Sequence, residues 1–333
     1  MIGALSRSQI LRCVAAIAGF ILTGCAASET EDAGVLRIGM MPKLVGIDYF
    51  NASEKGAREA AAELGVELVW DGPITADVTR QAQMLDSWIA QRLDAICVSP
   101  NDPHALAPTL RRARERGIRV LTWDSDSDAD SRDAFVNQAT YEGVGTALVD
   151  EMARQIGRAG EVAIITGSLT AANQNLWMEA MRARVLEAWP EMDIVTVRPS
   201  QEDQQLAFQV SQDLMKAHPG LRGLFAITSV AFPGAAEAVR QSGRAGEIAV
   251  VGLATPNGMK SYVHDGTVET VLLWNPVDLG YLTVHAAATL AKKGGLAQQL
   301  AAGRLGEVRV REGEVLLGPP MRFTAQNIDE FDF

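Results

Sequence analysis

The sequence predicts an α/β protein built from two doubly wound, Rossmann-like lobes with a ligand cleft between them. Three observations support this fold class. Short apolar segments alternate with amphipathic segments, which is typical of β-α-β units and a parallel sheet. The alternation pauses near residues 137–140 and then restarts. A chain of 333 residues is also long enough to form two hydrophobic cores.

The first half of the chain reads as strands connected by helices. We expect strands at residues 35–41, 66–70, 93–98 and 117–123, with helices at 53–64, 77–90 and 103–116 between them. Asp102 followed by Pro103 is typical of a helix N-cap and its first position. Gly65 and Gly117 are suited to end the helices that precede them.

The second half repeats the alternation. We expect helices at residues 141–156, 173–189, 203–217, 232–242, 257–265 and 278–292, and strands at 161–166, 193–197, 224–227, 248–252 and 268–274. The tail at 307–317 has strand character with a turn at Glu312 and Gly313. The last helix follows a strand that leads back to the first half. We therefore divide the chain into a first lobe at 35–137 and 275–300 and a second lobe at 138–274 and 301–333.

The first 24 residues read as an export signal. Arg7 and Arg12 precede an apolar segment at 14–22 that is too short to span a bilayer stably. The run Leu22-Thr23-Gly24-Cys25 follows and resembles the lipobox of bacterial lipoproteins. The resemblance implies cleavage before Cys25 and attachment of lipid to its sulfur.

Lipid on Cys25 would anchor an exported protein, periplasmic or at the cell surface, to a bacterial membrane. Residues 25–34 are small and acidic and are expected to form a flexible stalk. The alternative is a plain secretory peptide that is cleaved near Ala26 or Ala27.

Composition and motifs exclude several function classes. A net charge of −11 without any basic run argues against a nucleic-acid partner. The chain has no Gly-x-Ser-x-Gly, no P-loop and no dinucleotide fingerprint after a strand. Its four histidines lack metal-ligand spacing, and Cys97 lies in a buried-strand pattern typical of an inert thiol. We therefore expect a binding protein without catalytic residues, cofactor or metal.

Trp123 and Asp124 stand where the fourth predicted strand ends. In an open α/β sheet, ligands bind outside the carboxyl ends of the strands. An indole beside a carboxylate offers an apolar platform and a charged acceptor, which suits a small polyhydroxylated molecule. The alternative is that Trp123 is part of the core and Asp124 caps the next turn.

Other predicted strand ends also carry polar or aromatic residues. Lys43 is able to donate to ligand hydroxyls, and Tyr49 and Phe50 to stack on a sugar ring. Alternatively, Lys43 is a solvated loop lysine, and Tyr49 and Phe50 form a hydrophobic staple at the start of the next helix. In the second half, the amides of Asn173 and Gln174 open a helix and are able to hydrogen-bond a neutral polyol, although Asn173 also suits an N-cap.

Residues 35–333 resemble the periplasmic sugar-binding proteins of ABC importers, the ribose-binding-like (type I) superfamily. The motifs that carry the resemblance are 42–46, 71–73, 120–126 and 173–177. The resemblance implies two Rossmann-like lobes joined by three crossovers, a ligand in the cleft, and hinge closure on binding.

Two branches are most similar, the rhamnose-binding and the autoinducer-2-binding proteins. Lys43, Asp124 and Gln174 match ligand-contacting residues of the autoinducer-2 branch, whereas Asn173, Ile227 and Ser229 depart from it. The rhamnose-binding branch is similar at 99–103, 173–175, 274–281 and 317–320. Other members of the superfamily carry an Asp that is absent here from residues 252–254. The ligands of the ribose and galactose binders are therefore a weaker guide to the ligand of this chain.

The resemblance and the strand ends together predict the solute-binding component of an ABC-type sugar importer. We expect a monomer that binds a neutral monosaccharide, with a rhamnose-like deoxyhexose favoured, and delivers it to a permease. The alternative is a receptor subunit that senses autoinducer-2 or a sugar. The candidate ligand-binding residues are Lys43, Tyr49, Phe50, Asn101, Trp123, Asp124, Asn173, Gln174, Trp177, Thr228, Ser229, Trp274 and Asn275.

Overall fold

The computed structural model describes residues 34–333, which form one compact unit from Val35 onward. The predicted export signal, Cys25 and nearly all of the predicted stalk lie outside the described residues. Within the described residues, no helix has the length and apolar character needed to cross a membrane.

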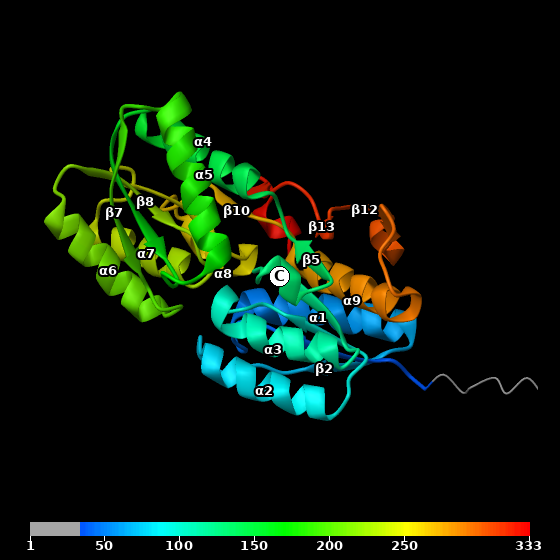
Figure 1. The fold of residues 1–333 in the computed structure, drawn as a ribbon. Helices are drawn as coiled ribbons and strands as arrows, with labels where there is room; N and C mark the ends of the chain where they lie inside the picture. Colours follow the sequence, from blue (N-terminus) through cyan, green and yellow to red (C-terminus); the bar gives the residue numbers. More distant parts are fainter. Residues whose placement is uncertain (1–33) are drawn as a thin grey trace, which may run out of the picture. The chain divides into compact units, whose positions relative to one another are not determined.

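The first lobe begins with the predicted strand–helix units (Figure 1). Its elements are β1 Arg37–Met41, α1 Asp48–Leu64, β2 Glu67–Trp70, α2 Val78–Ala90, β3 Ala95–Val98, α3 Pro103–Glu115, β4 Arg119–Trp123 and β5 Ala134–Asn137. The Asp102 side chain accepts from the amides of His104 and Ala105, so it is the predicted N-cap. Helix α1 begins at Asp48, earlier than predicted, and ends at the left-handed Gly65.

The second lobe repeats this arrangement. Its elements are α4 Tyr141–Ile156, β6 Gly160–Thr166, α5 Ala172–Ala188, β7 Met192–Pro199, α6 Gln204–Ala217, β8 Leu221–Ala226, α7 Ala231–Ser242, β9 Ala249–Leu253, α8 Pro256–His264 and β10 Val271–Leu273. The chain then adds α9 Pro276–Lys293, β11 Gln299–Ala301, β12 Glu307–Arg311, β13 Glu314–Leu316 and β14 Met321–Phe323, with short 3-10 turns at Ala129–Ser131, Gly303–Leu305 and Ile328–Glu330.

The two sheets have the same core topology. The first has the order β11-β12-β13-β5-β4-β3-β1-β2, and the second has the order β14-β10-β9-β8-β6-β7. The parallel strands therefore run 2-1-3-4-5 in one lobe and 7-6-8-9-10 in the other, which confirms the doubly wound α/β prediction. The chain passes between the sheets three times, after β5, β10 and β13.

The tail of the chain corrects the predicted lobe boundary. Strands β11, β12 and β13 belong to the first sheet, where Glu314 to Leu316 pair in parallel with Phe135 to Asn137 of β5. The assignment of 301–316 to the second lobe is therefore wrong. Only β14 lies in the second sheet, antiparallel to β10. Each sheet has an edge strand with which the tail of the chain could pair. The sequence of the tail therefore does not indicate which of the two sheets it joins.

Two glycines allow α1 and α9 to lie side by side in the first lobe (Figure 1). A Cβ on Gly56 would lie 1.7 Å from the Val277 carbonyl oxygen, and one on Gly280 would lie 1.9 Å from that of Ser53. Only glycine permits this backbone approach. Helix α9 thus returns to the first lobe, as predicted, and fixes the start of α1, which carries Tyr49 and Phe50.

Strand alternation gives the first sheet two apolar faces. Ala95 and Cys97 of β3 pack with α1 and α9, whereas Ile96 and Val98 pack with α2 and α3. Both faces are covered, so the strand reads as a continuous apolar run. Burial raises the pKa of the Cys97 thiol, which agrees with the predicted core position.

Candidate functional site

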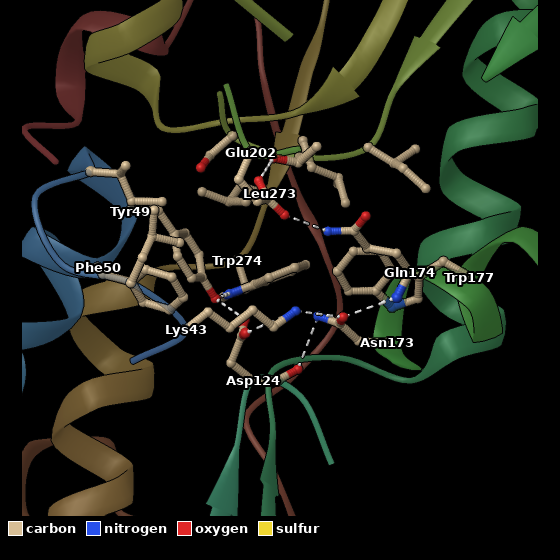
Figure 2. Close-up of a pocket in the computed structure, with 16 residues that line it drawn as sticks. Lys43, Tyr49, Phe50, Asp124, Asn173, Gln174, Trp177, Glu202, Leu273 and Trp274 are labelled. Atoms are coloured by element: carbon tan, nitrogen blue, oxygen red, sulfur yellow. Dashed lines mark hydrogen bonds and ion pairs between the residues drawn. The ribbon is translucent and has the colours of Figure 1, made fainter. Parts of the chain in front are cut away.

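A cavity lies where the carboxyl ends of the two sheets meet (Figure 2). It is small in this structure, with about 50 Å³ of room for water-sized molecules. Its lining residues are Lys43, Leu44, Ile47, Tyr49, Phe50, Asp124, Asn173, Gln174, Trp177, Glu202, Ile227, Thr228, Ser229, Leu253, Leu273 and Trp274. Its combination of apolar walls with a few polar groups is typical of small-molecule sites.

Asp124 is the central acceptor of the first-lobe wall. It follows β4 with φ +61, a left-handed conformation that Asp tolerates better than most residues. One carboxylate oxygen accepts from the Tyr49 hydroxyl at 2.8 Å and the other from the Ser99 hydroxyl at 2.8 Å. The Lys43 ammonium lies 4.0 Å from Asp124 Oδ2. Asp124 is only 4% exposed, and these donors and the nearby ammonium compensate its buried charge before any ligand binds.

Lys43 connects the two lobes. Its ammonium donates to Asn173 Oδ1 at 2.9 Å, and Asn173 Nδ2 donates to the Asp124 carbonyl oxygen at 3.2 Å. Lys43 follows β1 of the first sheet, whereas Asn173 lies in the first turn of α5 in the second lobe. These hydrogen bonds hold the two walls together across the cavity.

The second-lobe wall is built around Gln174. Its carbonyl oxygen accepts from the Gly167 amide at 2.7 Å, and its amide nitrogen donates to Glu202 Oε1 at 3.1 Å. The other oxygen of Glu202 accepts from the Thr228 hydroxyl. A Cβ on residue 167 would lie 1.9 Å from Glu202 Oε1, so Gly167 leaves room for this carboxylate.

Aromatic residues form much of the remaining wall. Trp274 donates from its indole nitrogen to the Tyr49 hydroxyl at 2.9 Å. The Trp274 ring lies 5.8 Å from the Trp177 ring, and the Tyr49 ring lies 5.0 Å from the Phe50 ring. Trp177 is buried, and its indole N–H has no hydrogen-bond partner among the described residues. A ligand acceptor in the cavity would satisfy that group.

Tyr49 remains a neutral donor. Burial, and then the adjacent Asp124 carboxylate, raises the pKa of the Tyr49 hydroxyl well above its usual value. Tyr49 therefore keeps its proton at neutral pH and donates it to Asp124, while accepting from Trp274. The single Tyr49 hydroxyl at the start of α1 thus connects the Asp124 carboxylate with the Trp274 indole.

The cavity brings together most of the predicted residues. Those that line it are Lys43, Tyr49, Phe50, Asp124, Asn173, Gln174, Trp177, Thr228, Ser229 and Trp274. Most of these lie just after a strand or in the first turn of a helix, where open α/β sheets place their ligand sites, and Trp177 lies in the second turn of α5.

Three predicted residues do not line the cavity. Trp123 is fully buried, donates to the Met41 carbonyl oxygen and packs on Phe50, so the core alternative describes it. Asn101 donates to the Lys43 carbonyl oxygen and so supports the Lys43 loop. Asn275 accepts from the first amides of α9 as its N-cap.

Several lining residues were not predicted. Glu202 follows β7, and its only sequence signal is a polar loop after an apolar segment, a feature common to many loops. The remaining lining residues outside the predicted set are apolar. Ile227 was noted only as a departure from the autoinducer-2 branch, and the others carry no signal that separates them from the core: Leu44, Ile47, Leu253 and Leu273. Among residues 34–333, no cluster of His, Cys, Asp and Glu is arranged to hold a metal ion.

Comparison with known proteins identifies relatives of the chain. A D-ribose/D-allose-binding protein of Pseudomonas aeruginosa is 28% identical over 266 residues, which are 76% of this chain and 83% of that protein. An ABC transporter solute-binding protein from Clostridium phytofermentas with bound L-rhamnose is 27% identical, with a TM-score of 0.84 over 89% of this chain and 98% of that one. LsrB from Clostridium saccharobutylicum in complex with AI-2 is 26% identical, with a TM-score of 0.85 over 90% of this chain and 100% of that one.

The family model described as the periplasmic binding protein domain matches residues 38–295, well over half of the chain. The match spans both lobes and all of the residues that line the cavity. The chain therefore belongs to the periplasmic binding protein family, with the type I fold, and its relatives are substrate-binding proteins of transporters and not enzymes.

Proposed function

We propose that this protein is the solute-binding component of an ABC-type sugar importer and that it binds a neutral monosaccharide between its lobes. The observation that carries the proposal is the buried Lys43–Asp124–Asn173 group, which lines the cavity together with aromatic side chains. Hydroxyls of a sugar both donate and accept, so they match a wall that combines an ammonium, a carboxylate and an amide. Aromatic side chains complement the apolar faces of a sugar ring.

A deoxyhexose such as rhamnose is the favoured ligand. Aliphatic side chains from both lobes line part of the cavity: Leu44, Ile47, Ile227, Leu253 and Leu273. A methyl group in place of a hydroxyl gains from burial against these side chains, by about 25 cal/mol per Å² of apolar surface. The related solute-binding protein with bound L-rhamnose supports this choice.

Autoinducer-2 is the second candidate ligand, and a sensing role is the corresponding second function. The specific observation in its favour is that Lys43, Asp124 and Gln174 line the cavity and match the autoinducer-2 branch. The related LsrB in complex with AI-2 adds support. Ile227 and Ser229 weigh against it, because they alter the wall in bulk and in polarity.

Binding would act through closure of the lobes on the ligand. Lys43 and Asn173 already bridge them in the described state. A ligand that contacts both walls binds the closed state more tightly and shifts the population toward it. The closed protein would then dock on a permease.

The remaining parts of the proposal concern the N-terminus and the assembly. Cleavage before Cys25 and lipid attachment would anchor the protein to a membrane after export. The stalk would let the folded unit reach its permease. We propose that the folded unit acts as a monomer.

Identification of the co-purifying ligand tests the proposed function. The protein is purified in its natural host, denatured, and the released small molecules are analysed by mass spectrometry. A neutral monosaccharide supports the proposal, and a deoxyhexose supports its finer form. Release of autoinducer-2 favours the second candidate, and release of an amino acid or a nucleotide contradicts both. A ligand-free preparation is screened by thermal shift against the same compounds.

A further inference from the structure

We propose that Glu202 is the second lobe's charged hydrogen-bond acceptor for the ligand and that it makes the site select against anionic sugars. The inference rests on the proposed function, since it names the ligand class and a specificity residue of the same cavity. Glu202 lies across the cavity from Asp124 (Figure 2). It was not among the residues expected from the sequence.

The contacts of Glu202 leave part of its acceptor capacity unused. One oxygen accepts from Gln174 Nε2 at 3.1 Å and the other from the Thr228 hydroxyl. An ionised carboxylate has about four acceptor positions. The two protein donors therefore orient the group and leave positions available to ligand hydroxyls.

Glu202 differs from Asp124 in its charge environment. Asp124 has Lys43 beside it at 4.0 Å. No Lys, Arg or His in the described part of the chain forms an ion pair with Glu202, whose partners are the neutral Gln174 and Thr228. The charge of Glu202 is therefore balanced by dipoles alone.

The charged residues that line the cavity are Lys43, Asp124 and Glu202. Their formal charges leave one negative charge in excess. Repulsion between like charges is stronger in a partly desolvated site than in water. A sugar acid or a sugar phosphate is thereby disfavoured, whereas a neutral sugar gains a charge-assisted hydrogen bond from hydroxyl to carboxylate.

The chain builds a specific place for this carboxylate. Glu202 has a left-handed backbone with φ +54. Gly167 lies so near that a Cβ there would be 1.9 Å from Glu202 Oε1. The close approach of Gly167 and the left-handed turn together position the Glu202 carboxylate at the cavity.

The test compares Glu202→Gln with the parent by titration calorimetry, with L-rhamnose, D-ribose and D-allose as probes. Gln has the same shape and keeps both protein contacts, because its oxygen accepts from Gln174 and its amide donates to a reoriented Thr228 hydroxyl. We expect the affinity for the sugar that binds the parent to fall roughly 10- to 150-fold, the range for a hydrogen bond to a charged group.

Asp203→Asn is the matched control. It removes the same charge from the neighbouring residue, whose side chain is exposed and caps α6 through the Leu206 amide. Asn caps a helix as well as Asp does. We expect its affinity to stay within about threefold of the parent. Equal losses in the two variants would assign the effect to general charge and overturn the inference.

A second readout uses D-galacturonate as an anionic competitor in large excess. The parent should retain its bound sugar, and Glu202→Gln should lose part of this discrimination. Displacement from the parent, or unchanged sugar affinity in Glu202→Gln, would overturn the inference and leave the proposed function intact. A parent that binds neither these sugars nor any other neutral monosaccharide tried would instead contradict the proposed function. Thermal unfolding of the ligand-free variants checks that both fold as the parent does.

Discussion

The two walls of the cavity differ in how far their polar groups are satisfied without a ligand. In the first lobe, Asp124 is held by Tyr49 and Ser99 and lies beside Lys43. In the second lobe, the Trp177 N–H has no partner among the described residues, and Glu202 is held by neutral donors. Asp124 is thus part of the folded hydrogen-bond network, whereas the Trp177 N–H and the remaining acceptor positions of Glu202 are open to a ligand. Substitution of Asp124 should therefore affect stability and binding together, and substitutions of Trp177 and Glu202 should affect mainly binding.

Asp124→Ala should have the largest effect. It removes the acceptor of the buried Tyr49 and Ser99 hydroxyls and the acidic neighbour of Lys43. We expect binding to weaken by about 100-fold or more and the free energy of unfolding to fall by about 2 kcal/mol. Titration calorimetry and urea denaturation measure the two effects.

Asp124→Asn separates the two effects of that substitution. Asn keeps the side-chain volume and tolerates the left-handed φ of +61. It should retain most of the stability while binding remains weak. Full sugar affinity in either variant would refute the role assigned to Asp124.

Trp123→Leu should lower stability without weakening sugar binding. Trp123 is fully buried against Phe50 and Trp70 and does not line the cavity. We expect about 3 kcal/mol lower stability from lost packing. The sugar affinity of the folded fraction should change by no more than about threefold. An affinity loss as large as that of Asp124→Ala, with stability retained, would show that the indole contacts ligand.

Trp177→Phe should weaken binding without lowering stability much. It removes an indole N–H that is buried without a partner, so the gain from this deletion offsets part of the lost packing. We expect roughly 5- to 10-fold weaker sugar binding if the ligand accepts from this group. Trp274→Phe is the matched control, because its N–H already donates to Tyr49 and its loss should lower stability by about 1 kcal/mol. Unchanged binding in Trp177→Phe would leave the second wall without its proposed donor.

Asn275→Ala should have the smallest effect on binding. Asn275 accepts from the Val277 and Asp278 amides as the N-cap of α9. Its loss should cost about 1 kcal/mol of stability. Sugar affinity should stay within about twofold of the parent, as thermal unfolding with and without sugar would report. A marked loss of affinity would return Asn275 to the ligand-contacting set.

The sequence predicted the fold because its strands and helices obey local rules. Alternating apolar and amphipathic segments, the Asp102 cap and the Gly65 end each act over a few residues. The sheet that receives the hairpin at 299–316 was not predictable, since pairing with β5 depends on contacts between distant parts of the chain. The partner of any edge strand is equally hard to predict when its apolar pattern would suit both sheets.

The sequence predicted that the site lies at the strand ends. It did not predict which residues there line the cavity and which pack in the core. Asp124 and Trp123 are neighbours, yet one lines the cavity and the other packs in the core. Successive side chains point to opposite sides of a strand, and no local pattern says which side is open. Glu202 was missed for a related reason, because its position in the cavity depends on Gly167, which follows β6, and on Gln174 of α5.

Titration of the ligand-stripped protein with L-rhamnose tests the central claim most directly, with D-ribose and D-allose measured in parallel. The account predicts saturable binding of one neutral sugar per chain, lost in Asp124→Asn and unchanged in Asn275→Ala. Absence of binding heat and of thermal stabilisation with every neutral monosaccharide tried would contradict it.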